Sequence, residues 1–177
     1  MLGVDSHSTS ALTAGSVRIR PLVDGESGPV LAVFEGLGAR SRELRFMSPK
    51  PRLSSTDLCH LTHVDGMDRV ALVAELPDGR PIGIARFVRH ACDATAADVA
   101  VAVVDAWQRR GVGTRLAKAL GAWAREVAVR RFTVDMRQDN HGAARLMRHA
   151  GGRVRPVGVD AFSAEYEVEI DVAPVAI

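Results

Sequence analysis

Residues 99–116 have the sequence Val99-Ala100-Val101-Ala102-Val103-Val104-Asp105-Ala106-Trp107-Gln108-Arg109-Arg110-Gly111-Val112-Gly113-Thr114-Arg115-Leu116. The first part is an apolar run rich in β-branched residues, which predicts a strand. A basic turn with glycines at positions 111 and 113 follows, and a pattern of helical period begins at once. Backbone N–H groups at a helix N-terminus, beside glycines that have no side chain, predict a site that binds an anion.

The composition is that of an ordinary globular domain. Of the 177 residues, 47% are apolar and 25% are charged, and a chain of this length can bury a core of its own. The formal net charge of +2 is too small to indicate nucleic-acid binding by itself. Cys59 and Cys92 form neither a disulfide framework nor a metal-ligand spacing, so we expect no metal and no nucleic-acid partner.

The sequence lacks a recognisable targeting or membrane-spanning signal. No stretch is long and apolar enough to cross a membrane. Residues 1–15 are small and polar, without the basic start and apolar middle of a signal peptide. We therefore expect a cytoplasmic monomer or homodimer without a membrane partner. It would have a disordered leader at 1–15, a single domain at 16–172 and a frayed tail at 173–177.

Before the glycine turn, the patterns predict a strand, two helices and an antiparallel pair of strands. The turn signal Pro77-Asp78-Gly79-Arg80 joins the pair. Residues 93–97 are a short connection into the opening stretch. The expected elements are a strand at 17–22, a helix capped by Asp24 or Ser27 that ends near Gly38, a helix that begins at Ser54 or Ser55 after the helix-breaking segment Ser48-Pro49-Lys50-Pro51, and strands at 69–76 and 81–88.

After the turn, apolar residues at helical spacing predict a helix from about Gly111 to Val129. A strand at 131–136 follows. Asp139 or Asn140 then caps a short helix that Gly151-Gly152 ends. Residues 162–170 alternate apolar residues with serine and glutamate, which predicts a half-exposed strand.

This order of elements predicts an α+β domain. The strand–helix–strand unit from Val99 to Met136 is expected to be parallel and right-handed, whereas the earlier strands form an antiparallel meander. We therefore predict a mixed, mostly antiparallel central sheet of six to seven strands with helices on both faces.

The spacing Gln108-x-x-Gly111-x-Gly113 differs from two nucleotide-binding motifs. It is not a P-loop, and a dinucleotide fingerprint would need glycine where this chain has Leu116. The spacing does match Gln/Arg-x-x-Gly-x-Gly/Ala, and so resembles the pyrophosphate loop of the GNAT acetyltransferase superfamily. The order of elements from Val17 to Ile170 is similar as well. The alternative is an ordinary strand-to-helix turn.

The resemblance extends to the catalytic domain of Pat-type bacterial protein lysine acetyltransferases, over nearly the whole chain. It is carried by five segments besides the glycine turn: Phe46-Met47-Ser48-Pro49, Leu61-Thr62-His63-Val64-Asp65, Ile84-Ala85-Arg86-Phe87-Val88-Arg89, Ala97-Asp98-Val99-Ala100-Val101 and Asp139-Asn140. It implies a GNAT-like sheet, acetyl-CoA as cosubstrate and a primary amine, such as a protein lysine, as acceptor.

By this resemblance, the pyrophosphate would bind the amides at the start of the helix, and the pantetheine arm would pair with exposed main chain near Val103. A main-chain N–H near Val103 would also polarise the thioester carbonyl. The two arginines of the loop could equally form a solvated basic surface, and Asn140 could be only a helix cap. The implied cofactor-binding residues are Val103, Val104, Gln108, Arg109, Arg110, Gly111, Val112, Gly113, Thr114 and Asn140.

The acceptor amine must be neutral when it attacks the thioester. A free lysine has a pKa of about 10.4, so a base must take its proton, directly or through water. The family resembled here has a glutamate where this sequence has Asp98, which is one methylene shorter and favours a water relay. The alternative role for Asp98 is to cap a loop at the end of a strand.

The general acid has no candidate. Many GNAT enzymes have a tyrosine at the position of Met147, whereas the single tyrosine here, Tyr166, lies in the final strand. Two further functions therefore remain open beside acetylation of a protein lysine. One is an acyl-CoA-binding regulatory module with little or no catalysis, and the other is acetylation of a small-molecule amine.

Overall fold

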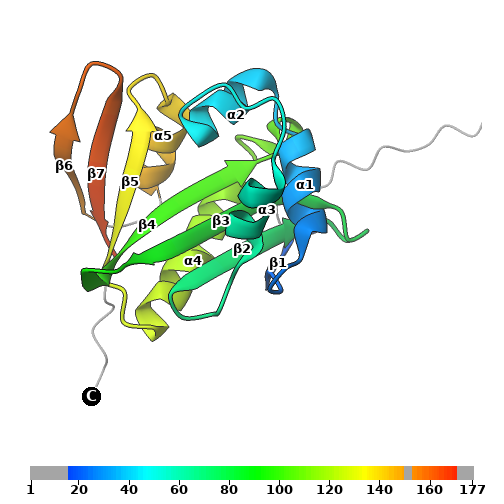
Figure 1. Cartoon of the computed structure of the whole chain (residues 1–177), viewed down its shortest axis with the longest axis horizontal. Coiled ribbons are helices and arrows are strands. Elements are labelled where there is room, and N and C mark those ends of the chain that lie inside the picture. Colours follow the sequence, from blue (N-terminus) through cyan, green and yellow to red (C-terminus); the bar gives the residue numbers. More distant parts are fainter. Residues whose placement is uncertain (1–15, 150–152, 171–177) are drawn as a thin grey trace, which may run out of the picture.

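The computed structural model describes residues 16–149 and 153–170. Seven strands form one sheet in the order β1-β2-β3-β4-β5-β7-β6 (Figure 1). All neighbouring strands are antiparallel except β4 and β5, which are parallel. The predicted mixed, mostly antiparallel sheet is therefore confirmed. The strands are β1 (Arg18–Pro21), β2 (Arg69–Glu75), β3 (Pro81–His90), β4 (Asp93–Val103), β5 (Arg131–Arg137), β6 (Val154–Val159) and β7 (Ser163–Glu169).

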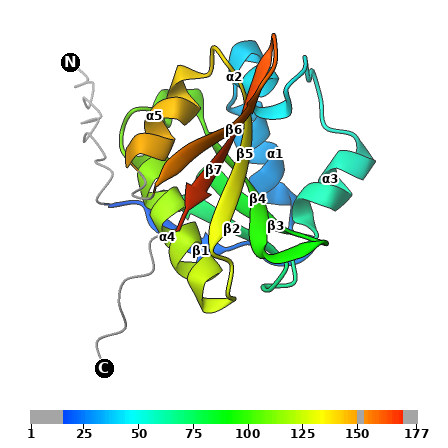
Figure 2. The same cartoon turned by 90° about the vertical axis from the view of Figure 1, so that its left-hand side faces the viewer.

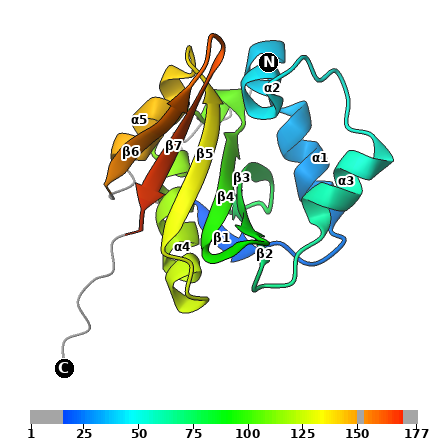
Figure 3. The same cartoon turned by 60° about the vertical axis from the view of Figure 1, so that its left-hand side comes forward.

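Helices cover both faces of the sheet, as predicted. Figures 2 and 3 show the first three helices on one face and the last two on the other. A short 3₁₀ turn, Asp105–Trp107, connects β4 to the glycine loop. Within the described ranges, no helix is both long and apolar enough to cross a membrane. The helices are α1 (Ser27–Glu35), α2 (Ala39–Phe46), α3 (Ser55–Thr62), α4 (Val112–Glu126) and α5 (His141–His149).

The core has two parts, one on each face of the sheet. On the α4 face, Leu116 and Leu120 are fully buried beneath the helix and belong to the same cluster as Phe87 of β3. On the opposite face, Val30 of α1 packs with Val73 of β2 in a smaller cluster. Valine, leucine and alanine make up most of the core, since aromatic residues are only 5% of the chain.

Several element boundaries differ from the sequence patterns. Asp93–Ala97 is the first part of β4 and not a connection, because it pairs with the end of β3 across a register shift at Arg89/His90. α1 ends at Glu35 instead of near Gly38, and a separate helix, α2, begins at Ala39. The predicted helix stop at Gly151-Gly152 lies outside the described residues.

The helix caps resolve the alternatives that the sequence left open. α3 begins after Ser54, whose hydroxyl accepts from the Asp57 N–H in a capping box. α5 follows Asn140, whose Oδ1 accepts from the Ala143 N–H at 3.0 Å. The N-cap of α1 is Glu26, not Asp24 or Ser27.

A buried carboxylate ties β1 to β2. The Glu75 side chain is only 5% exposed and accepts from Arg20 Nε at 2.8 Å and from Arg18 Nη2 at 2.9 Å. Arg20 also pairs with Glu26. Burial alone would raise the pKa of Glu75, but the hydrogen bonds from the two arginines outweigh it, and the pKa lies below its ordinary value of 4.5.

We predict that Glu75→Gln lowers the free energy of unfolding by about 2 kcal/mol at pH 7, because it leaves partly buried arginine charge without its partner. Because the pKa is depressed in the folded state, the stabilisation is complete above the unfolded-state pKa and is lost as the pH falls through the folded-state pKa. Urea unfolding of both proteins from pH 7 down to pH 3 measures the difference between their free energies of unfolding. Glu126→Gln, at an exposed position, is the control, and a difference that does not change with pH would contradict the assignment.

Candidate active site

The parallel strands β4 and β5 diverge after three residue pairs. Ala96, Ala97 and Asp98 pair with Arg131, Phe132 and Thr133, and the pairing ends there. Among the described strands, β4 continues to Val103 paired with β3 alone, while β5 continues to Arg137 beside β7. A gap between two neighbouring strands therefore opens immediately after Asp98.

The register shows which main-chain groups face this gap. The Val104 N–H donates to the Ile82 carbonyl at 2.9 Å, and in an antiparallel ladder every second residue of β4 then bonds to β3. The main-chain groups of Val101 and Val103, which lie beyond the last residue pair with β5, consequently point away from β3, toward the gap. This edge offers the groups that pair with an extended, strand-like ligand.

The two valines named for the pantetheine arm differ in what they can offer. The Val103 carbonyl accepts from Gln108 Nε2 at 3.1 Å, but its N–H faces the gap. In Val104 the N–H donates to Ile82, and the carbonyl accepts from the Trp107 N–H at 2.8 Å. Both main-chain groups of Val104 are thus engaged within the protein, and Val103 is the one with a donor for a ligand.

The glycine loop follows the C-terminal end of β4, away from Asp98, and presents a row of backbone N–H donors. Arg109 and Gly111 have positive φ angles of 57° and 82°, which turn the chain sharply into α4 at Val112. Within the described residues, no backbone hydrogen bond is donated by the N–H groups of residues 109–114. Successive free N–H groups in such a turn, at the positive end of a helix, favour an anion.

The polar side chains of the loop have contacts within the protein. Gln108 Nε2 donates to Asp105 Oδ1 at 2.9 Å and to Ser41 Oγ at 3.3 Å, in addition to Val103. Gln108 therefore fixes the loop against β4 and α2. The Arg110 guanidinium lies 5.1 Å from the centre of the Trp107 ring, which leaves its charge beside the loop.

Asp98 lies where the strands diverge, together with two residues that the sequence analysis missed. Its Oδ1 lies 2.8 Å from His90 Nε2 and accepts from the Thr133 hydroxyl, while His90 Nε2 lies 3.1 Å from the Thr133 oxygen. The Asp98 side chain is 72% exposed. The sequence pattern predicts a strand that ends at Val88, whereas β3 continues to His90. The short turn Ala91-Cys92, between His90 and β4, is the signal that could have placed the imidazole there.

Asn140 is a helix cap with one end free. Its Oδ1 caps α5, and its amide nitrogen has no hydrogen bond among the described residues. The neighbouring Asp139 accepts from Arg137 and from Arg40 of α2, and these bonds hold the pKa of Asp139 below its ordinary value. α2 is thereby linked to the loop after β5.

The structure offers no tyrosine beside Asp98. Met147, where many GNAT enzymes have that tyrosine, is buried in the core. Tyr166 packs against the cluster on the α4 face, whereas Asp98 lies on the other face, since Ala97 before it is buried with the α4 cluster. Among the described residues, no group of three or more His, Cys, Asp or Glu side chains is arranged to hold a metal ion.

Comparison with known proteins places the chain in a family. Residues 39–151 match the acetyltransferase (GNAT) family, so the chain belongs to that family. It is 34% identical over 163 residues to acetyltransferase Pat from Mycolicibacterium smegmatis. The aligned residues cover 89% of this chain and 46% of that protein. The chain thus spans about half the length of this relative.

Solved structures agree with the fold. The crystal structure of the GNAT domain of S. lividans PAT superposes with a TM-score of 0.79 and 31% identity, over 86% of this chain and 90% of that one. A structure of YncA from Salmonella typhimurium with its cofactor acetyl-CoA superposes with a TM-score of 0.68, over 92% of this chain and 99% of that one. At 18% identity, this second likeness shows the fold alone.

The two glycines of the loop should respond differently to alanine. Gly111→Ala places a Cβ on a residue with a φ of 82°, so we expect a loss of about 1 kcal/mol in the free energy of unfolding. Gly113→Ala is the matched control, because its Cβ would meet no atom closer than 3.7 Å and alanine favours a helix. Denaturant unfolding without ligand measures both, and equal stabilities would show that the loop backbone is not constrained as described.

Proposed function

We propose that this protein transfers an acetyl group from acetyl-CoA to a primary amine, and that the amine is a protein lysine side chain. The gap between β4 and β5 is the observation on which the proposal rests. It has unpaired main-chain groups along one edge, free loop amides at one end and the Asp98 carboxylate at the other. Membership of the acetyltransferase family supports the reaction, and the likeness to Pat proteins supports a lysine acceptor.

The residues of this chain fit acetyl-CoA in three places. The amides of residues 109–114 would bind the pyrophosphate, because a Cβ is missing at Gly111 and Gly113 and the helix dipole favours negative charge. Arg109 and Arg110 add positive charge. The edge formed by Val101 and Val103 would pair with the amides of the pantetheine arm, and the free amide nitrogen of Asn140 would donate to that arm.

One of these edge N–H groups would also stabilise the negative oxygen that forms when the amine attacks the thioester carbonyl. Val103 lies five residues from Asp98, which is about 16 Å along a strand, and Val101 lies three residues away, about 10 Å. A proton released by the amine must therefore reach Asp98 through water in either case, and Val101 shortens the path.

Asp98 would accept that proton. Both neighbours, His90 and Thr133, contact the same carboxylate oxygen, Oδ1, so Oδ2 stays available to water and substrate. The reaction forms the amide C–N bond and breaks the C–S bond. The leaving thiolate would take a proton from water, since no side-chain acid is assigned.

We predict that Asp98→Asn lowers kcat at least a hundredfold and leaves the Kd for acetyl-CoA within about twofold, because general-base catalysis contributes roughly 10²- to 10⁴-fold. Steady-state release of CoA gives kcat, and calorimetric titration gives the Kd. Asp98→Glu, which keeps a carboxylate, should retain most of the turnover. An unchanged kcat in Asp98→Asn would exclude the residue as the base.

A thiol-release assay with acetyl-CoA tests the acceptor. We expect release that rises with lysine-containing proteins and not with small amines. Release with small amines alone would assign the site to a small-molecule acetyltransferase. Tight CoA binding without turnover on any acceptor would assign it to an acyl-CoA-binding module.

A further inference from the structure

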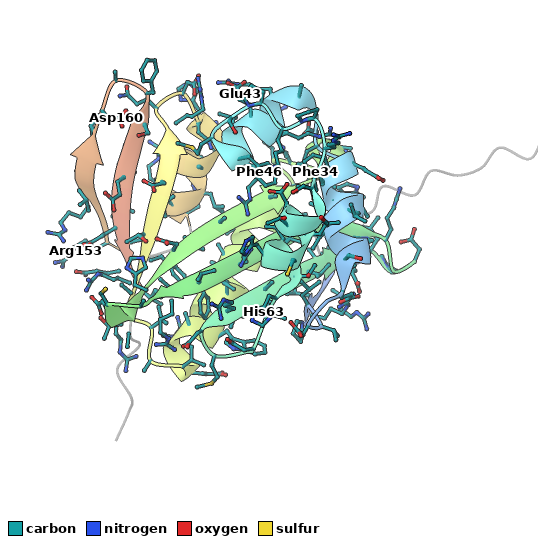
Figure 4. All side chains as sticks on the ribbon, in the orientation of Figure 1. Phe34, Glu43, Phe46, His63, Arg153 and Asp160 are labelled. Atoms are coloured by element: carbon teal, nitrogen blue, oxygen red, sulfur yellow. The ribbon has the colours of Figure 1, made fainter. Side chains whose placement is uncertain are left out.

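An apolar pocket lies beside Asp98, on the face of the sheet covered by α1, α2 and α3. It is open to solvent at its mouth, and Ala100 and Ala102 of β4 form part of its floor. Phe34 of α1 and Phe46 of α2 form part of its wall, with ring centres 5.9 Å apart (Figure 4). Residues at alternate positions of a strand share one face, so Asp98 points to the same side as this floor.

Two arginines line this otherwise apolar pocket. Arg45 comes from the last turn of α2, and Arg86 comes from β3, where it is paired with Ala100 in the register. Both are half-buried. Arg45 lies 5.0 Å from the centre of the Phe46 ring, and Arg86 Nη1 donates to the His60 carbonyl at 3.0 Å. Within the described parts of the chain, neither has a carboxylate within ion-pair distance.

These two charges are held at a cost. Burial, and then the positive charge of Arg86, lower the pKa of Arg45 to about 10. Burial, and then the charge of Arg69, lower the pKa of Arg86 as well. A guanidinium that loses water without gaining a carboxylate is destabilised. An anion placed between the two arginines would remove that cost.

We propose that this pocket binds a carboxylate of the amine acceptor, and that Arg45 and Arg86 make the protein selective for amines with such a group. The inference rests on the proposed function, because it needs an acceptor. The acceptor side is favoured over the acyl group because the proton of the amine must pass to Asp98, which lies on the face of the sheet that has both arginines. The carboxylate can come from an acidic residue near the lysine of a protein, or from a small amine that has its own carboxylate.

The position of the arginines sets the spacing within the acceptor. Arg86 is opposite Ala100, two residues along β4 from Asp98, which is about 7 Å. Nζ of a lysine that reacts in the gap therefore lies within one or two side-chain lengths of the anion. A glutamate next to the lysine in sequence, or the carboxylate of a free amino acid, satisfies this spacing.

Matched acceptors test the inference. Capped peptides with a single lysine have one glutamate, or one glutamine, at each of the four nearest positions, and Nα-acetyl-lysine is compared with its amide. For the wild type we expect kcat/KM at least tenfold higher for the best carboxylate acceptor than for its neutral match. In Arg45→Met and in Arg86→Met the ratio should fall to about one. Arg52→Met, which removes an exposed arginine between α2 and α3, should keep the preference.

The results separate this inference from the proposed function. Preference confined to the peptides, or to Nα-acetyl-lysine, supports the inference and identifies the source of the carboxylate. Equal rates for carboxylate and neutral acceptors, or a preference that survives both methionine variants, would overturn it. So would an Arg45-dependent preference for succinyl-CoA over acetyl-CoA, because the pocket would then hold the acyl group.

Two readouts do not depend on turnover. Fluorescence anisotropy with labelled peptides should show tighter binding of the glutamate peptide, with the difference lost in Arg45→Met. If no acceptor reacts, the proposed function fails, and this measurement still decides whether the pocket binds a carboxylate. Thermal unfolding should show Arg45→Met at least as stable as wild type, because the variant removes a half-buried charge that has no carboxylate partner among the described residues. A clear loss of stability would contradict the idea that this arginine is kept for a ligand.

Discussion

β4 and β5 share only three residue pairs, and each strand is bound to another neighbour beyond that point. β4 follows β3 to its end, and β5 follows β7 over its whole length. Neither can close the gap without losing those bonds. A sheet interior without a partner on one side leaves main-chain N–H and C=O groups that water or a ligand must satisfy. The fold thus creates a polar slot in its middle, and α4, which links the two strands, places its N-terminus at one end of it.

α2, which contacts the ends of both β4 and β5 beside this slot, is held by polar contacts more than by packing. α2 has no fully buried residue. It is fixed by Gly38, whose N–H donates to Asp105, by the pairing of Arg40 with Asp139, and by the pairing of Glu43 with Arg137 at 3.3 Å. These contacts join α2 to the ends of both β4 and β5.

The sequence predicted what depends on local pattern, and it missed what depends on distant contacts. Apolar periodicity was sufficient for β2, β3, α4 and β7, and the fold class followed from their order. α2 had no apolar stripe to reveal it, because distant ion pairs hold it. His90 and Thr133 meet Asp98 only through the register of three strands, which includes a shift at Arg89/His90. Val103 and Val104 are alike in sequence, and only the hydrogen-bond phase of β4 distinguishes them.

Asp98 and Arg86 lie on one face of the sheet but do not form an ion pair with each other, so both charges stay available to a ligand. They are diagonal neighbours on adjacent strands, because Asp98 is opposite Val88 and Arg86 is opposite Ala100. A long arginine side chain can reach across such a diagonal, and an ion pair between them would neutralise both. Instead, Arg86 donates to the His60 carbonyl of α3, and the Asp98 carboxylate contacts His90 of β3 and Thr133 of β5. Opposite charges held apart on one face have a polarity that a molecule with both an amine and a carboxylate would match, with its amine toward Asp98.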